Sequence, residues 1–327
     1  MFSTNEWDKL QTVIVSRADD STVPFIEPSL RLVQYAHVKN LKDIKQGPYP
    51  KQVIDEANED LETLVALLHR EGCSVYRSDP VWKPKFTNFC PRDVMFLYEN
   101  LALVPPLPVQ CRREDYLSIL GLVSNEGEVT ISPTLQGSYH VYNSQVLTEN
   151  TLALHNRFPL FDASNILKAN DDLYYLLSNS SNLEGSFYLN NLLPNKRVHV
   201  INNIKTDLHI HNTIVFLREG LMLLNPKHIT SKEQLPSTLH SWDVIWCPDP
   251  VDIGSYPGYI SYTEQFNMDL LVVNPNLVVL EENQIPLAQE LAKYNIESAL
   301  LPMRHAKTLN GGFRTVTLDL HRSSEVS

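Results

Sequence analysis

The chain lacks the patterns that mark several classes of protein. No apolar run approaches the roughly 18 residues of a membrane span, and the N-terminus has no basic region followed by an apolar one. The four cysteines lie far apart and form no Cys-x-x-Cys pair, which argues against a zinc site or a disulfide framework. Lysine and arginine form no cluster and the net charge is −11, so neither a nucleic acid nor an anionic membrane is an expected partner. These absences predict a cytoplasmic protein with reduced thiols.

What is present is a globular composition. Of the 327 residues, 43% are hydrophobic and 20% are charged, which is enough to bury a sizeable core. The chain has no linker-like stretch, so we expect a single domain over residues 1–327. Its clearest helix lies between Pro50 and Gly72, where apolar residues recur at helical spacing among charged ones.

A recurring unit follows that helix: an apolar run, a short polar turn and a second apolar run. The unit occurs at Asp93–Val104, Thr213–Leu224 and Leu270–Leu280, with a weaker copy at Ala169–Leu177. Helix-patterned segments such as Pro286–Tyr294 lie between several copies. Hairpin-and-helix units repeated along one chain predict a closed or radial arrangement, in which each unit packs against the next.

A Gly-Gly pair introduces the last predicted strand. Residues 311–322 read Gly-Gly-Phe-Arg-Thr-Val-Thr-Leu-Asp-Leu-His-Arg. The simplest interpretation is a hairpin turn, although glycines before a strand also let a ligand or another segment approach the backbone. The segment resembles the C-terminal motif of the amidinotransferase family, which includes glycine amidinotransferase and inosamine-phosphate amidinotransferase. The resemblance runs from Asn5-Glu6-Trp7 to Arg322 and implies an α/β propeller (pentein) fold, with five ββαβ-type units around a pseudo-fivefold axis.

The resemblance also implies where a substrate binds. Arg92-Asp93 matches a family pair whose aspartate accepts two parallel hydrogen bonds from the guanidinium of arginine. Taken alone, such a pair is more often a local salt bridge. His211 stands where the family has a second guanidinium-binding aspartate.

The acid/base pair is expected in two other segments. His209 matches the catalytic histidine of the family. Residues 161–165, Phe-Asp-Ala-Ser-Asn, resemble Phe-Asp-Ala-Ala-Asp, whose final aspartate we take to orient that histidine. The amide of Asn165 in that position can accept a hydrogen bond but cannot stabilise an imidazolium with a full charge.

The main departure from the family lies at the nucleophile. In the family, a cysteine at the position of Thr315 attacks the guanidinium carbon, releases ornithine and passes the amidino group to an amine. A threonine hydroxyl has a much higher pKa than a thiol and must lose its proton to a base during attack. Thr263, Met268, Gly311 and Gly312 fall where the family lines its substrate pocket.

The residues alone leave two other kinds of site open. If residues 207–213 form a strand, Asp207, His209 and His211 share one face, which suits a divalent metal or a polar strand face without a special role. Cys90 is a candidate displaced nucleophile. On an extended segment, however, it would point away from Asp93, three residues later.

The sequence therefore predicts a divergent amidinotransferase-family protein that acts on a small biosynthetic molecule without a metal or another cofactor. We favour a retooled transferase or hydrolase, with Thr315, His209 and Asn165 as a hydroxyl-based relay. The alternatives are a non-catalytic protein that binds a small molecule or a partner, and arginine:amine amidino transfer by an unusual route. Assembly as a homodimer stays open.

Overall fold

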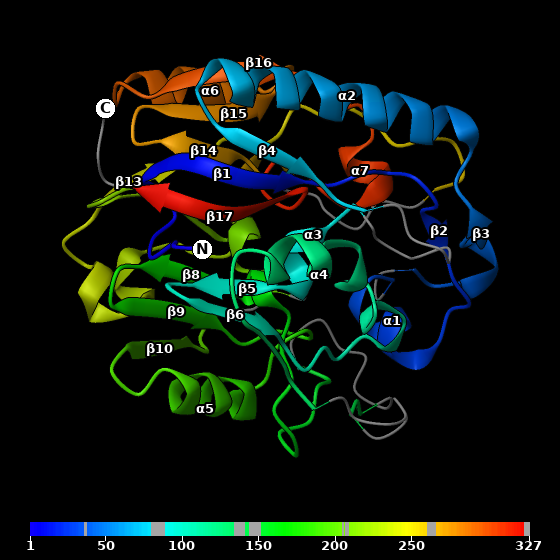
Figure 1. Cartoon of the computed structure of the whole chain (residues 1–327), viewed down its shortest axis with the longest axis horizontal. Coiled ribbons are helices and arrows are strands. Elements are labelled where there is room, and N and C mark those ends of the chain that lie inside the picture. Colours follow the sequence, from blue (N-terminus) through cyan, green and yellow to red (C-terminus); the bar gives the residue numbers. More distant parts are fainter. Residues whose placement is uncertain are drawn as a thin grey trace.

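The computed structural model describes residues 1–35, 38–79, 89–133, 141–143, 152–204, 206, 209–259 and 266–323. Within these residues the strands form five three-stranded sheets and one two-stranded ladder. In each larger sheet the central strand pairs antiparallel with one neighbour and parallel with the other. Figure 1 shows the sheet that joins both chain ends between the sheets of the C-terminal and middle segments.

Four of the sheets are a hairpin followed by a crossover and a third strand, and in the first sheet the C-terminal and N-terminal strands take the place of the hairpin. The first contains β17 (Thr317–Ser323), β1 (Lys9–Val15), α2 (Lys51–Arg70) and β4 (Ser74–Arg77). The second contains β5 (Phe96–Tyr98), β6 (Leu101–Val104), α4 (Leu117–Ser124) and β7 (Val129–Ile131). The third contains β8 (Ile166–Ala169), β9 (Asp172–Leu176), α5 (Leu183–Leu192) and β10 (Arg197–Ile201).

The fourth sheet uses short 3₁₀ turns in place of a helix. It contains β11 (Ile214–Arg218), β12 (Leu221–Leu224), η5 (Lys232–Gln234), η6 (Ser237–Leu239) and β13 (Asp243–Trp246). The fifth contains β14 (Leu271–Asn274), β15 (Leu277–Glu281), α6 (Ile285–Ala292) and β16 (Glu297–Leu301). Outside the sheets lie β2 (Thr22–Val23), α1 (Pro28–Val33), η1 (Leu41–Asp43), β3 (Gly47–Pro48), η2 (Gln110–Arg112) and α7 (Ala306–Leu309). None of the described helices combines the length and apolar character needed to cross a membrane.

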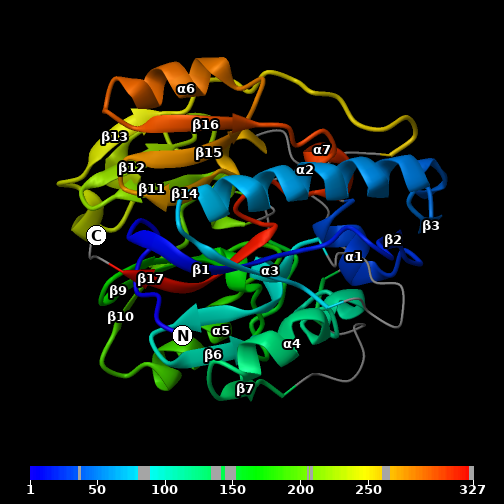
Figure 2. The same ribbon diagram turned by 45° about the horizontal axis from the view of Figure 1, so that its top comes forward.

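A short helical turn precedes the first strand of each sheet. These turns are α3 (Pro91–Val94), η3 (Ala163–Asn165), η4 (Ile210–Asn212), η7 (Phe266–Met268) and the turn at residues 313–316. Contacts join α3 to η3, η3 to η4, η4 to η7, β14 to β1 and β17 to α3, so the five units form a closed ring. The predicted five-unit α/β fold is therefore confirmed, and Figure 2 shows its sheets from a second direction.

The sequence pattern located most of these elements. The predicted helix between Pro50 and Gly72 is α2, and three of the predicted hairpins are β5–β6, β11–β12 and β14–β15. The weaker unit, predicted at Ala169–Leu177, starts earlier in the structure: its hairpin begins at Ile166. The buried Lys168 interrupts the apolar run of β8 and hides the start of that strand.

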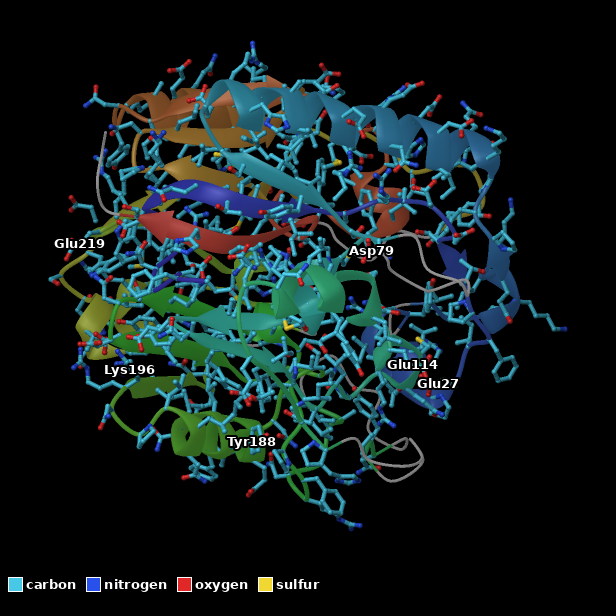
Figure 3. The ribbon with its side chains drawn as sticks, viewed as in Figure 1. Glu27, Asp79, Glu114, Tyr188, Lys196 and Glu219 are labelled. Atoms are coloured by element: carbon cyan, nitrogen blue, oxygen red, sulfur yellow. The ribbon has the colours of Figure 1, made fainter. Side chains whose placement is uncertain are left out.

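Buried ion pairs hold the last strand against its neighbours. Asp319 of β17 accepts from the guanidinium groups of Arg92 and Arg322, the latter at 2.8 Å (Nε to Oδ2). Burial opposes the charge on Asp319, but these two guanidinium groups outweigh it and lower the pKa of its carboxyl group. A different pair lies at the surface, where Lys196 (Figure 3) places its Nζ 2.8 Å from Oδ1 of Asp171.

We expect Asp319→Asn to lower the free energy of unfolding by about 3–5 kcal/mol, because two buried guanidinium groups would lose their shared carboxylate. Urea unfolding of the wild type and the variant measures the difference. Asp171→Asn is the matched control, since it removes an exposed carboxylate and should cost about 1 kcal/mol or less. Similar losses in the two variants would contradict a structural role for the buried cluster.

Candidate functional site

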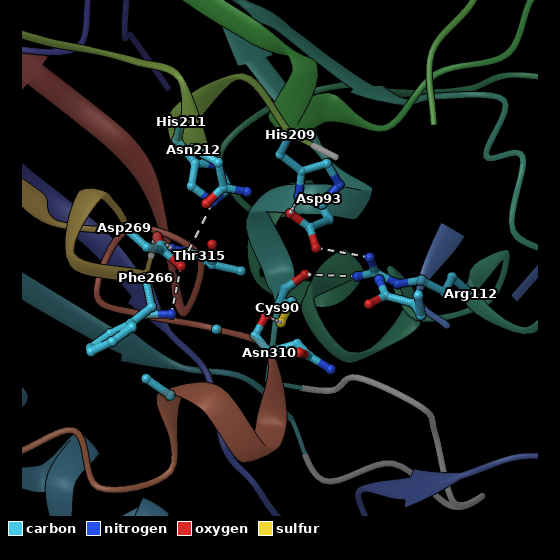
Figure 4. A pocket seen from close by; sticks show the side chains of 14 residues that line it. Cys90, Asp93, Arg112, His209, His211, Asn212, Phe266, Asp269, Asn310 and Thr315 are labelled. Atoms are coloured by element: carbon cyan, nitrogen blue, oxygen red, sulfur yellow. Dashed lines mark hydrogen bonds and ion pairs between the residues drawn. The ribbon is translucent and has the colours of Figure 1, made fainter. Parts of the chain in front are cut away.

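Four of the five helical turns of the ring, α3, η4, η7 and residues 313–316, contribute side chains to one pocket (Figure 4). Six of the predicted site residues line it together: Asp93, His209, His211, Gly311, Gly312 and Thr315. The same pocket contains residues that the sequence did not single out: Gln34, Arg112, Asn212, Phe266, Asp269, Ala306 and Asn310. Its free volume is about 20 Å³, which exceeds the minimum that a water molecule needs, so only a small group can enter it.

Other predicted residues lie elsewhere. Arg92 is buried in the ion cluster with Asp319, where its Nε donates to two backbone carbonyl groups. Met268 packs in the hydrophobic core, because its turn directs the side chain away from the pocket side. Neither residue belongs to the described pocket lining. Thr263, and Asp207 of the metal hypothesis, fall outside the described residues.

The partner of His209 differs from the prediction. Nε2 of His209 lies 3.0 Å from Oδ2 of Asp162, the residue that precedes η3. Asn165, fully buried, instead donates to Ser180 Oγ at 2.7 Å and accepts from Ser178 at 3.4 Å. Asp162 is the N-cap of the 3₁₀ turn that ends at Asn165, and only the first of these two polar side chains reaches the histidine. The histidine therefore has a carboxylate partner after all.

A second carboxylate faces the other side of the ring. Nδ1 of His209 lies 3.5 Å from Oδ1 of Asp93, so each ring nitrogen faces a carboxylate. Burial alone would lower the pKa of His209, but the negative charges of Asp93 and Asp162 outweigh burial and raise it. The imidazole is therefore more readily protonated than an ordinary histidine.

Asp93 also has a permanent cationic partner. Nη1 of Arg112 lies 2.8 Å from Oδ2 of Asp93, and Ser164 donates to the other oxygen. Burial opposes the charge of Asp93, yet His209 and Arg112 together hold the pKa of its carboxyl group below the ordinary value. Sequence reasoning missed Arg112, because an arginine in a connecting segment carries no motif and only its complete burial marks it.

The second histidine lies beside Arg314. Residues 210–212 form the 3₁₀ turn η4 rather than the predicted strand, so alternation along a strand does not place His209 and His211 together. Their rings are nevertheless 5.6 Å apart (centroid to centroid). Nδ1 of His211 is 3.5 Å from Nη1 of Arg314, and its Nε2 is 3.8 Å from Oδ2 of Asp269. Burial lowers the pKa of His211 to about 3, which keeps its imidazole neutral.

Thr315 sits at the end of a tightly held turn. The carboxylate of Asp269 accepts the backbone N–H groups of Gly312 and Thr315, the second at 2.9 Å. The Thr315 hydroxyl is buried and finds no hydrogen-bond partner among the described residues. A buried hydroxyl without a partner costs roughly 1–3 kcal/mol, and one that lines a pocket is placed to bond a ligand or water.

Cys90 lines the pocket, contrary to the prediction from an extended segment. It precedes α3, and a helical turn places residues i and i+3 on one face, so Cys90 and Asp93 both reach the pocket. Burial raises the pKa of the Cys90 thiol well above its ordinary value, and nearby Asp93 adds to the shift. The thiol is therefore protonated near neutral pH, which does not suit a nucleophile.

Five small three-stranded sheets in a ring, with a carboxylate–histidine pair at their centre, define a pentein-type protein. An inosamine-phosphate amidinotransferase from Streptomyces glaucescens is 31% identical, and the alignment covers 98% of this chain and 97% of that protein. The solved inosamine-phosphate amidinotransferase from Streptomyces griseus superposes with a TM-score of 0.92 at 31% identity, over 100% of this chain and 98% of the other.

More distant matches support the same fold. A dimethylarginine dimethylaminohydrolase from Pseudomonas aeruginosa superposes with a TM-score of 0.63 at 13% identity, covering 95% of this chain and 99% of that one. No family model matches the sequence. The full-length relatives at 31% identity are decisive: the chain belongs to the amidinotransferase family.

The neutral state of His211 predicts a pH dependence of stability. Between pH values of about 6.5 and 3 the unfolded chain holds a proton that the folded His211 does not, so acid favours unfolding. We expect the wild type to lose about 2 kcal/mol more unfolding free energy than His211→Asn between pH 7 and pH 5. Urea unfolding across this range measures the difference. His69→Asn, at an exposed position of α2, should follow the wild type; parallel curves for all three proteins would contradict the neutral buried imidazole.

Proposed function

We propose that this protein is a retooled transferase or hydrolase for a small biosynthetic molecule, in which His209 moves the proton and Thr315 positions the substrate. The observation that carries the proposal is the environment of His209. Its two ring nitrogens face Asp162 and Asp93, which favours a protonated imidazole poised to act as an acid. Groups in this arrangement deliver a proton to a leaving atom held at Asp93.

The same geometry argues against a covalent route through Thr315. A threonine hydroxyl attacks only if a base removes its proton. The Thr315 hydroxyl has no partner among the described residues, so nothing there activates it. The hydroxyl-based relay predicted from the sequence therefore changes in two respects. Asp162, rather than Asn165, orients His209, and the nucleophile is a molecule other than the protein.

In the hydrolytic form of the reaction, the oxygen of water bonds to the electrophilic carbon as the bond from that carbon to the leaving group breaks. His209 gives its proton to the leaving group and takes one from the water, so it returns to its starting state. In the transferase form, an acceptor amine or hydroxyl replaces water. Asp162 holds the imidazole in orientation and stabilises its charge.

The relatives support a small biosynthetic substrate, since two of them are inosamine-phosphate amidinotransferases and another comes from the saxitoxin biosynthetic pathway. Ordinary transfer of an amidino group from arginine is not expected of this chain. Thr315 replaces the thiol, and His211 replaces one guanidinium-binding carboxylate of the family pattern.

A panel of small esters, amides, ureas and guanidines, analysed by mass spectrometry for products, tests the proposal. On any substrate found, His209→Ala and Asp162→Asn should each reduce kcat by about 10²–10⁴-fold, the range for acid–base groups and their orienting carboxylates. Thr315→Val should raise KM more than it lowers kcat. A covalent adduct on Thr315 would contradict external attack, and turnover unaffected by His209→Ala would eliminate the acid–base role.

Arginine as a trial substrate tests both departures from the family pattern, Thr315 and His211. We expect neither Thr315→Cys nor His211→Asp alone to release ornithine, because one restores only the thiol and the other only the carboxylate. The double variant should release it measurably, since Asp93, Asp162 and His209 are already in place. Ornithine is quantified by mass spectrometry, with Cys73→Ser as a matched change of a buried thiol outside the pocket. Ornithine formation by the wild type would contradict the proposal.

A further inference from the structure

The hydrogen-bonding character of the pocket wall at His211 is opposite to that of a carboxylate. An arginine side chain can only donate, so Nδ1 of His211, 3.5 Å from Nη1 of Arg314, must accept. A neutral imidazole with an accepting Nδ1 carries its proton on Nε2. The family pattern has an acceptor at this position, whereas this chain presents an N–H donor.

That donor is not used by the nearest carboxylate. Nε2 of His211 is 3.8 Å from Oδ2 of Asp269, beyond hydrogen-bond length. Both oxygens of Asp269 already accept backbone N–H groups, from Gly312 and Thr315. His211 lines the pocket, so an Nε2–H that Asp269 does not accept is available as a donor for a ligand oxygen.

Two oxygen atoms nearby lack a hydrogen-bond donor. Oδ1 of Asn212 and Oγ1 of Thr315 are buried, line the same pocket and have no hydrogen-bond partner among the described residues. An amide oxygen can only accept, and a hydroxyl oxygen can accept as well. A ligand that satisfies this wall thus offers one acceptor to His211 and N–H donors to Asn212 and Thr315.

The charges at the pocket favour a neutral ligand. Asp93 is paired with Arg112 at 2.8 Å and lies beside His209, and His211 contributes no charge where the family pattern has a carboxylate. A guanidinium would bring its N–H groups against the N–H of His211. Its positive charge would also face one carboxylate fewer than in the family pattern.

We propose that the pocket binds a neutral carbamoyl group, –C(=O)–NH₂, in the place where its relatives' pattern implies a guanidinium. The carbonyl oxygen accepts from Nε2–H of His211, and the NH₂ group donates to Asn212 and Thr315. Such a group is planar and a few atoms in size, which suits the pocket. The assignment rests on the proposed function only in using the same site, and it names the substrate class as a urea or a primary amide.

Three ligands of equal length test this assignment: N-propylurea, pentanamide and N-propylguanidinium. Isothermal titration calorimetry of the full chain should rank N-propylguanidinium weakest, by about tenfold or more, because a donor would face a donor. N-propylurea carries the carbamoyl group of a urea and pentanamide that of a primary amide, so their relative affinities distinguish the two substrate classes. Equal or tighter binding of the guanidinium than of both neutral ligands would overturn the proposal.

Two variants of His211 make the test specific. His211→Asp should reverse the ranking in favour of the guanidinium, while His69→Asp, which adds the same charge at an exposed position, should keep the wild-type ranking. His211→Gln offers both a donor and an acceptor and should reduce the discrimination without adding a charge. An unchanged ranking in His211→Gln and His211→Asp would overturn the role of His211.

The tautomer is open to direct measurement on the wild type. Long-range ¹H–¹⁵N correlation spectra should show the His211 proton on Nε2, and a proton on Nδ1 would overturn the argument. Calorimetry needs no turnover, so carbamoyl binding together with turnover that His209→Ala leaves unaffected would defeat the acid–base proposal and leave this one standing. Conversely, His209-dependent turnover of a guanidine alone would defeat this proposal and leave the acid–base mechanism intact.

Discussion

The carboxylate of Asp269 fixes the turn from which the rest of the site is arranged. Its two oxygens accept the backbone N–H groups of Gly312 and Thr315. A Cβ at position 312 would lie 2.7 Å from the carbonyl oxygen of Asp269, so only glycine lets these segments approach so closely. Because the turn leads directly into β17, this contact sets both where the C-terminal strand enters the first sheet and where the Thr315 hydroxyl lies.

Two buried charge systems surround that turn, and Arg314 touches both. Its Nη2 is 3.5 Å from Oε2 of Glu6, a carboxylate that also lies 3.8 Å from Arg92 in the buried ion cluster with Asp319. Its Nη1 is 3.5 Å from Nδ1 of His211 in the pocket. Arg92, by contrast, donates to Asp319 and to a backbone carbonyl group and does not line the pocket. Removing a charge from either system leaves a partner buried without compensation, so the fold constrains which pocket residues can differ from the family pattern.

Sequence patterns predicted a closed arrangement of repeated units because hairpins and amphipathic helices carry local periodicity, as at α2 and β14–β15, and the family resemblance supplied the number of units. The site was only partly predictable. Thr315, His209 and Asp93 could be placed by motif, but the choice between Asp162 and Asn165 depended on the geometry of a three-residue turn. Arg112 gave no local signal, since its role arises from burial beside Asp93, 19 positions earlier in the chain. A helical turn likewise reversed the expectation for Cys90.

The pocket residues that match the family pattern differ in their chemistry from those that depart from it. In the proposed mechanism Asp93, Asp162 and His209 hold a substrate and move a proton, and His209 contacts both carboxylates. Thr315 and His211 stand where the family pattern has a thiol and a carboxylate, two groups that are negative when they act on a guanidinium. Both replacements are neutral, so together they lower the attraction for a cation while leaving the proton-transfer pair intact. These two replacements, with His209 and its carboxylates retained, are the reason that we propose an electrophile without a positive charge as the substrate.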